Sequence, residues 1–282
     1  MTRKEQPEFL NEWVASAFQE SSVVEAYQFR PVYPAETFEV LAELLPRGNK
    51  TVLDVGCGTG LIARNLVPFV TRVDAIDISS AMIAKGQRLP RGNYPNLHWH
   101  LGKAEESFPR PPYGLITAGE SLHWMDWKIV MPRFTDVLAP DGLLAILQPK
   151  QESVPWDKEL TEIISTYSTT RDFRKFDLVS ELEQRQLFQK LGTKVTNPTK
   201  FVRSVEDYTE SFHGRASFSR ERMTAEKAAA FDRALLELVK PFTVNGMIEL
   251  SVSAEIVWGK PLARSSMEKQ NEQNATPRGK RD

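Results

Sequence analysis

The chain has 282 residues, of which 36 are Lys or Arg and 37 are Asp or Glu, so its formal net charge is −1. This balance creates no global field that would attract nucleic acid or an anionic membrane. No apolar run is long enough to cross a bilayer, and the first residues lack the hydrophobic stretch of a signal peptide, so we expect a cytoplasmic protein. Cys57 is the only cysteine, which excludes an intrachain disulfide and a cysteine-cluster metal site. The length favours one core domain with a sizeable insertion over two small domains.

The first notable segment is YQFRPVYP, residues 27–34, which precedes a helix expected over residues 35–45. It holds two tyrosines and Arg30, whose guanidinium fork matches a carboxylate with two hydrogen bonds. A proline-rich linker with surface aromatics is the alternative interpretation of the same residues.

The most informative segment is TVLDVGCGTG, residues 51–60, which reads as a strand that ends in an acidic residue and a glycine-rich turn. Glycines at Gly56, Gly58 and Gly60 allow positive φ and the close approach of a ligand to the main chain. Apolar residues at helical spacing follow, so the turn lies between a strand end and a helix start, where open α/β sheets bind ligands.

A second strand is expected over residues 72–78, and Asp77 at its end is placed to hydrogen-bond a ribose diol. The glycine spacing is G-x-G-x-G, and Leu61 occupies the position where the dinucleotide fingerprint has a third small residue. Ser79 or Ser80 then caps a helix through about residue 87.

The alternation of strands continues with Leu97–Leu101, residues 113–118 and residues 143–147. His98 and His100 share a face of the first of these, but no third ligand lies nearby in sequence, so we expect no metal site. The segment GESLHWMDW, residues 119–127, opens onto the carboxyl edge of the sheet.

Residues 149–241 change to amphipathic helices, with a short strand at residues 201–203. We expect a helical insertion over the carboxyl edge of the sheet, with one strand returning to the sheet. Its basic residues either bind an acidic substrate or form an ordinary solvated face; they are Arg171, Arg174, His213 and Arg215. Residues 248–258 alternate apolar and polar, which predicts an antiparallel strand near a sheet edge, and the last eighteen residues are expected to be disordered.

The glycine turn with Asp54, followed by Asp77, Ile78, Ser79 and Met82, resembles the cofactor site of class I S-adenosylmethionine-dependent methyltransferases. That resemblance implies an α/β fold with a doubly wound, seven-stranded, mostly parallel sheet, an antiparallel last strand and a helical lid insertion. It also implies that Gly56, Gly58 and Gly60 approach the methionine part and sugar of the cofactor, that Asp77 holds the ribose hydroxyls, and that Ile78 and Met82 pack on adenine.

The same resemblance assigns roles to the other candidate residues. Ala104 and Glu105 meet the adenine amino group, although Lys103 stands where the family usually has an acid. Gly119 and Glu120 lie by the amino acid end of the cofactor. The remaining cofactor candidates form a lid segment that faces the carboxylate and methyl regions: Tyr27, Arg30 and Tyr33.

The His123-Trp124 pair resembles trans-aconitate methyltransferase-like enzymes, in which it shapes the wall near the reacting methyl. His123 can also accept a proton from a substrate hydroxyl, because its pKa lies near working pH, or it can be a packed structural residue.

These observations predict methyl transfer from S-adenosylmethionine to an oxygen, or less readily a nitrogen or carbon, of a small molecule, with no nucleic acid or membrane partner. An NAD-dependent oxidoreductase and a non-catalytic cofactor-binding module are the alternatives, and the chain is expected to be a monomer or homodimer. The expected parts are a core with an N-terminal lid (1–149), a helical insertion with one returning strand (150–242), the last strand (243–264) and a disordered tail (265–282).

Overall fold

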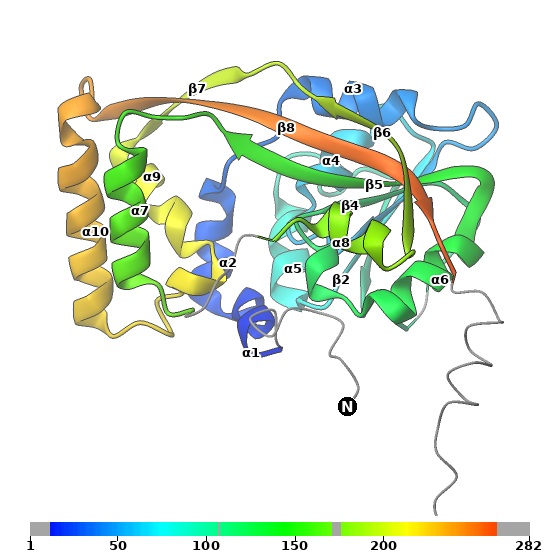
Figure 1. The fold of residues 1–282 in the computed structure, drawn as a ribbon, viewed down its shortest axis with the longest axis horizontal. Coiled ribbons are helices and arrows are strands. Elements are labelled where there is room, and N and C mark those ends of the chain that lie inside the picture. Colours follow the sequence, from blue (N-terminus) through cyan, green and yellow to red (C-terminus); the bar gives the residue numbers. More distant parts are fainter. Residues whose placement is uncertain (1–11, 107, 171–175, 264–282) are drawn as a thin grey trace, which may run out of the picture.

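The computed structural model describes residues 12–106, 108–170 and 176–263, which form a single eight-stranded sheet flanked by helices (Figure 1). The tail expected at 265–282 lies outside the described residues. The strand order is β3-β2-β1-β4-β5-β8-β6, and β7 pairs with the other part of β8. The strands are β1 Thr51–Val55, β2 Arg72–Asp77, β3 Leu97–Leu101, β4 Tyr113–Gly119, β5 Leu138–Gln151, β6 Phe188–Val195, β7 Thr199–Ser204 and β8 Met247–Pro261.

The first five strands are parallel, and the three last strands pair antiparallel around β8. The doubly wound, mostly parallel fold expected from the sequence is therefore confirmed, with eight strands in place of seven. Strands β1 and β4 are apolar and buried on both faces, as central parallel strands under helices must be.

Helices cover both faces of the parallel part of the sheet. One apolar cluster joins α3 and α4 to the strands, and a second joins α6 and α8 to the opposite face. The helices are α1 Glu12–Ala15, α2 Ser21–Ala26, α3 Ala35–Glu43, α4 Leu61–Leu66, α5 Ser80–Arg88, α6 Trp127–Val137, α7 Asp157–Tyr167, α8 Leu178–Gln184, α9 Val205–His213 and α10 Ala225–Val239. Most of the helix and strand bounds expected from the sequence agree with the structure within two residues.

The core part of β8 lies between β5 and β6, one strand from the edge of the sheet, as the alternation of residues 248–258 predicts. The antiparallel part of the sheet differs from the expectation in two ways. Strand β5 is longer than residues 143–147, because it continues through Gln151 to pair with β8. Two strands lie in the insertion instead of one, and β6 went unrecognised because most of its side chains are exposed and Gly192 interrupts its alternation.

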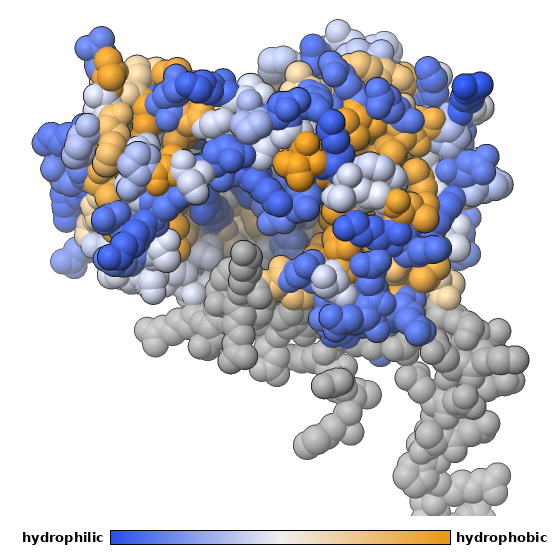
Figure 2. Space-filling view, turned by 45° about the horizontal axis from the view of Figure 1, so that its top comes forward, coloured by the Kyte–Doolittle hydropathy of each residue, from blue (hydrophilic) through white to orange (hydrophobic). Residues whose placement is uncertain are grey.

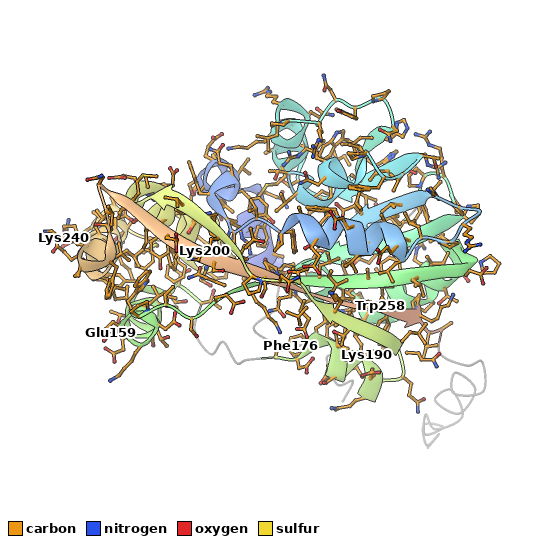
Figure 3. All side chains as sticks on the ribbon, turned by 90° about the horizontal axis from the view of Figure 1, so that it is seen from above. Glu159, Phe176, Lys190, Lys200, Lys240 and Trp258 are labelled. Carbon is orange, nitrogen blue, oxygen red and sulfur yellow. The ribbon has the colours of Figure 1, made fainter. Side chains whose placement is uncertain are left out.

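The insertion forms its own apolar core with α7, α9, α10 and the outer half of β8. Ser204 and Thr224 cap α9 and α10 by accepting hydrogen bonds from main-chain N–H groups, as their sequence positions indicate. The view from above shows β8 running from this helical part, which carries Lys240 and Glu159, to the core, which carries Trp258 (Figure 3).

The N-terminal helices fill the space between the insertion and the core. Helix α2 contacts α9 of the insertion and α5 of the core. Its residues Val23 and Val24 pack with Met82 of the core and Ala216 of the insertion in one apolar cluster. In the space-filling view the core and the insertion form two lobes, with polar residues spread over both (Figure 2). None of the helices in the described ranges is both long and apolar enough to cross a bilayer.

Candidate active site

The glycine-rich turn joins β1 to α4 and carries three left-handed residues. The φ angles of Gly56, Gly58 and Gly60 are +62°, +55° and +73°, a region that side chains disfavour. A Cβ atom built on Gly60 would lie 2.4 Å from Cη2 of Trp99, and one on Gly56 would lie 2.5 Å from Cβ of Ser121. The glycines are therefore required by the packing of the protein itself, as well as by any ligand that approaches the turn.

Asp77 at the end of β2 ties this turn to the next helix. Its carboxylate accepts hydrogen bonds from the N–H of Gly58 at 2.7 Å and the N–H of Ser79 at 2.8 Å. Burial raises the pKa of Asp77, and these hydrogen bonds act against the rise. Each carboxylate oxygen has further acceptor capacity, so the group can still bind a pair of ligand hydroxyls.

Asp54 lies directly beneath the turn and is 1% exposed. It accepts hydrogen bonds from the hydroxyl of Thr117 at 2.8 Å and from the N–H of Ala63 at 3.1 Å. Burial raises the pKa of Asp54 to about 7, against the effect of both hydrogen bonds. Asp54 therefore links β1, β4 and α4 at the floor of the site.

A pocket of about 470 Å³ opens above this floor, within the size range of small-molecule sites. Its walls come from the N-terminal segment, the glycine turn and the ends of β4 and β5. Seven of the residues expected in the cofactor site line it: Tyr27, Arg30, Tyr33, Asp54, Gly56, Gly119 and Glu120. The structure thus brings the segment before α3 and the turn after β1 to one place.

Several further residues line the same pocket without having been predicted from the sequence. They are Gln28, Phe29, Pro31 and Val32 from the N-terminal segment, Cys57, Thr59, Leu61, Ile62 and Arg64 from the turn and α4, Leu89 and Pro90 after α5, and Pro149 near the end of β5. Pro149 follows the buried part of β5, and the rule that ligands bind at the carboxyl ends of parallel strands identifies it. The others lack a recognisable chemical signature.

Arg30 and Glu120 form an ion pair across the pocket at 2.6 Å. The guanidinium also lies 5.2 Å from the centroid of the Tyr27 ring, a cation–π distance. Burial acts to lower the pKa of Arg30, but Glu120, Tyr27 and Tyr33 together raise it. Arg30 therefore stays charged, and its remaining N–H groups can donate to a ligand carboxylate.

His123 and Trp124 form a 3-10 turn after β4, with their ring centroids 4.7 Å apart. Burial lowers the pKa of His123 to about 4, with Glu120 acting against the shift and Arg30 adding to it. The imidazole is consequently neutral at pH 7 and able to accept a proton. Neither residue lines the pocket of about 470 Å³.

The residues expected around adenine lie apart from this pocket. Ile78 is 43% exposed, whereas Met82 is buried under the N-terminal helices. Ala104 is buried against the core, and the carboxylate of Glu105 accepts a hydrogen bond from the N–H of Asp126 at 2.9 Å. Glu105 thus has a structural partner at the start of α6, which its sequence position did not reveal.

The four basic residues expected in the insertion have different positions. Arg171 and Arg174 lie outside the described residues. His213 is fully buried, with Nδ1 2.6 Å from the carbonyl of Phe218 and Nε2 2.7 Å from the carboxylate of Asp232. Both ring nitrogens therefore have hydrogen-bond partners inside the insertion. Of the two that the structure describes, Arg215 belongs to the surroundings of the Arg30–Glu120 pair.

The paired histidines of β3 have no metal-binding geometry. Nε2 of His100 lies 3.1 Å from the carboxylate of Asp74, which is fully buried. Across the described ranges, no group of three or more His, Cys, Asp or Glu side chains is arranged to hold a metal ion.

The family and the relatives that this chain resembles in sequence are methyltransferases. The methyltransferase domain family matches residues 28–197, which is more than half of the chain. An uncharacterized methyltransferase of Mycobacterium tuberculosis, Rv3342, is 33% identical over 146 residues, covering 51% of this chain and 57% of the relative. A trans-aconitate 2-methyltransferase of Streptomyces avermitilis is 31% identical over 124 residues, covering 42% of this chain and 46% of the relative.

Among solved structures, a protein from Anaeromyxobacter dehalogenans, provisionally assigned as a type II methyltransferase, superposes with a TM-score of 0.58 at 22% identity. The match covers 83% of this chain and 99% of that one, and at this identity it shows the fold alone. The assignment rests on the family match over residues 28–197, which includes the glycine turn and Asp77. The chain therefore belongs to the S-adenosylmethionine-dependent methyltransferases of class I fold.

Proposed function

We propose that this enzyme transfers the methyl group of S-adenosylmethionine to an oxygen of a small-molecule acceptor. The observation that carries the proposal is the pocket in which Tyr27, Arg30 and Tyr33 of the N-terminal segment meet the glycine turn and Glu120. Its volume, its aromatic wall and its paired charges fit an amino acid attached to a nucleoside.

The residues present also fit the rest of the cofactor. Asp77 has the acceptor capacity to hold the ribose hydroxyls, and Arg30 has free donors for the amino acid carboxylate. We assign the adenine end to the exposed face of Ile78, with the neighbouring positions Met82, Ala104 and Glu105 as its surroundings.

The cofactor supplies a methyl group already activated by its sulfonium. The protein then contributes positioning and the exclusion of water more than strong acid–base groups. Tyr27 lies against the turn, because a Cβ atom built on Gly58 would lie 3.2 Å from Cε1 of its ring, and Tyr33 lines the same pocket. Burial raises the pKa of both phenols, so both remain neutral. The likeness to a trans-aconitate 2-methyltransferase and the basic character near Arg30 favour an acceptor that carries carboxylates.

Isothermal calorimetry with S-adenosylhomocysteine, S-adenosylmethionine and NADH tests the proposal directly. We expect binding of the first two and none of NADH, followed by methyl incorporation in a labelled-methyl screen of small-molecule acceptors. Absence of heat with both sulfur nucleosides contradicts the proposal. Cofactor binding without turnover of any acceptor favours a non-catalytic module instead.

Replacing Asp77 by alanine is expected to weaken S-adenosylhomocysteine binding by about ten- to hundredfold, because charged hydrogen bonds to the ribose are lost. Asp177→Ala is the matched control, since Asp177 also accepts a hydrogen bond from a main-chain N–H, at the start of α8 and away from the site. Calorimetry measures both dissociation constants. If Asp77→Ala binds S-adenosylhomocysteine as tightly as the control does, the ribose site does not lie at the end of β2.

Replacing His123 by glutamine is expected to lower kcat about a hundredfold for a hydroxyl acceptor, because the neutral imidazole no longer takes the proton. Since the pKa of His123 is about 4, the acid limb of the wild-type pH profile should fall near that value instead of near 6.5. The dissociation constant of S-adenosylhomocysteine serves as the control and should stay constant. An unchanged kcat would identify His123 as a packing residue.

A further inference from the structure

One guanidinium beside the pocket has no carboxylate partner in the part of the chain that the structure describes. Arg215 follows α9, and its neighbour Gly214 touches the N-terminal segment: a Cβ atom built on Gly214 would lie 3.2 Å from Cγ of Arg30 and 3.2 Å from the carbonyl oxygen of Ala26. The insertion therefore places Arg215 beside the Arg30–Glu120 pair.

The surroundings of Arg215 hold it in place without compensating its charge. Its guanidinium lies 4.7 Å from the centroid of the Phe212 ring, and Phe212 is itself buried. Among the described residues, no carboxylate lies within ion-pair distance of Arg215. Within residues 12–106, 108–170 and 176–263, the carboxylate that affects the pKa of Arg215 is Glu120, which already pairs with Arg30 at 2.6 Å.

Taken together, Arg30, Glu120 and Arg215 carry a net charge of +1. Arg30 and Arg215 are positive, Glu120 is negative, and Tyr27 stays neutral because burial raises its pKa. A partly buried cation without a partner is costly, and a ligand carboxylate that pairs with it regains the lost solvation. The Phe212 ring keeps the planar fork oriented for such a pair.

We propose that Arg215 binds a carboxylate of the methyl acceptor and so determines specificity for anionic acceptors. This inference rests on the proposed function and names the substrate class of the same site. A carboxylate of the cofactor has the same chemistry, but Arg30 lines the pocket of about 470 Å³ and Arg215 does not, so Arg215 lies on the insertion side of the ion pair.

The test uses the 282-residue chain saturated with S-adenosylhomocysteine and titrated with succinate, citrate and neutral succinamide at constant ionic strength. Calorimetry should show that the wild type binds the carboxylates and ignores succinamide. Arg215→Gln should weaken carboxylate binding at least about tenfold, and Arg215→Lys, which keeps the charge but loses the fork, should weaken it less.

Arg233→Gln is the matched control, because Arg233 is an exposed arginine on α10 of the same insertion, and it should bind like the wild type. Since Arg215→Gln removes an uncompensated charge, its melting temperature should not fall, which confirms that the variant folds.

Equal carboxylate affinity in wild type and Arg215→Gln overturns the inference, as does a tenfold loss of S-adenosylhomocysteine affinity, which would assign Arg215 to the cofactor. A wild type that binds no S-adenosylhomocysteine contradicts the proposed function itself, whereas one that binds it and ignores the carboxylates contradicts only the role of Arg215.

Discussion

Replacing Gly60 by alanine should lower the free energy of unfolding by about 3 kcal/mol. Two costs add at this position. A side chain at a φ of +73° is strained, and the new Cβ atom would lie 2.4 Å from Cη2 of Trp99, well inside contact distance. Urea denaturation followed by circular dichroism measures the change.

Gly246 provides the control that separates the two costs. It has a φ of +71°, but nothing lies within 4 Å of a Cβ atom built there, so Gly246→Ala should cost only about 1 kcal/mol. Trp99→Phe removes the clashing ring atom, and a double-mutant cycle with Gly60→Ala should return a coupling of about 1–2 kcal/mol. If Gly60→Ala and Gly246→Ala lose equal stability, and Gly60→Ala shows no coupling with Trp99→Phe, Trp99 does not constrain the turn.

The second large effect is a pH dependence of stability that Asp54 introduces. Its pKa rises from an ordinary value of 3.8 to about 7 in the folded protein, because burial disfavours the carboxylate. The folded state therefore holds a proton that the unfolded state has released between these pH values. The stabilisation is fully present below about pH 4 and is lost as the pH rises to 7, by an amount on the order of 4 kcal/mol.

Asp54→Asn is the variant that isolates this contribution. The amide can still accept from the N–H of Ala63 and can donate to the hydroxyl of Thr117, so the network keeps its partners at every pH. Unfolding free energies of both proteins at pH 4.5, 5.5, 6.5 and 7.5 should show the wild type losing stability relative to the variant. A difference that stays constant over this range would mean that Asp54 is ionised throughout.

The parallel half of the fold could be predicted from the sequence because its signals are local. Strands β1, β2 and β4 are short and mostly buried, and β3 alternates apolar residues with His98 and His100. Ser79 marks the start of α5 with a side chain that accepts a hydrogen bond from the N–H of Met82. The glycine turn and Asp77 follow from the same local pattern. Their hydrogen bond, from Gly58 to Asp77, joins residues whose proximity depends only on two adjacent parallel strands.

The rest depends on contacts between distant parts of the chain. Strand β6 is largely exposed, and Gly192 is needed there because a Cβ atom would lie 2.3 Å from Cζ2 of Trp258, more than sixty positions away in the sequence. In the same way, nothing near Glu105 in sequence reveals that it accepts from the N–H of Asp126. The neighbourhood of Arg215 and Arg30 is set by the packing of α9 against the N-terminal segment, which no local pattern encodes.

The continuity of β8 restricts how the two lobes can move. One half of this strand is hydrogen-bonded to β5 and β6, and the other half to β7, so both lobes share a single uninterrupted backbone ladder. A hinge between them would have to break ladder hydrogen bonds in the middle of the strand. The N-terminal segment is held outside this ladder by side-chain packing, the Arg30–Glu120 ion pair and a hydrogen bond from Arg203 to the carbonyl oxygen of Phe29, so we expect the site to open for substrate entry there.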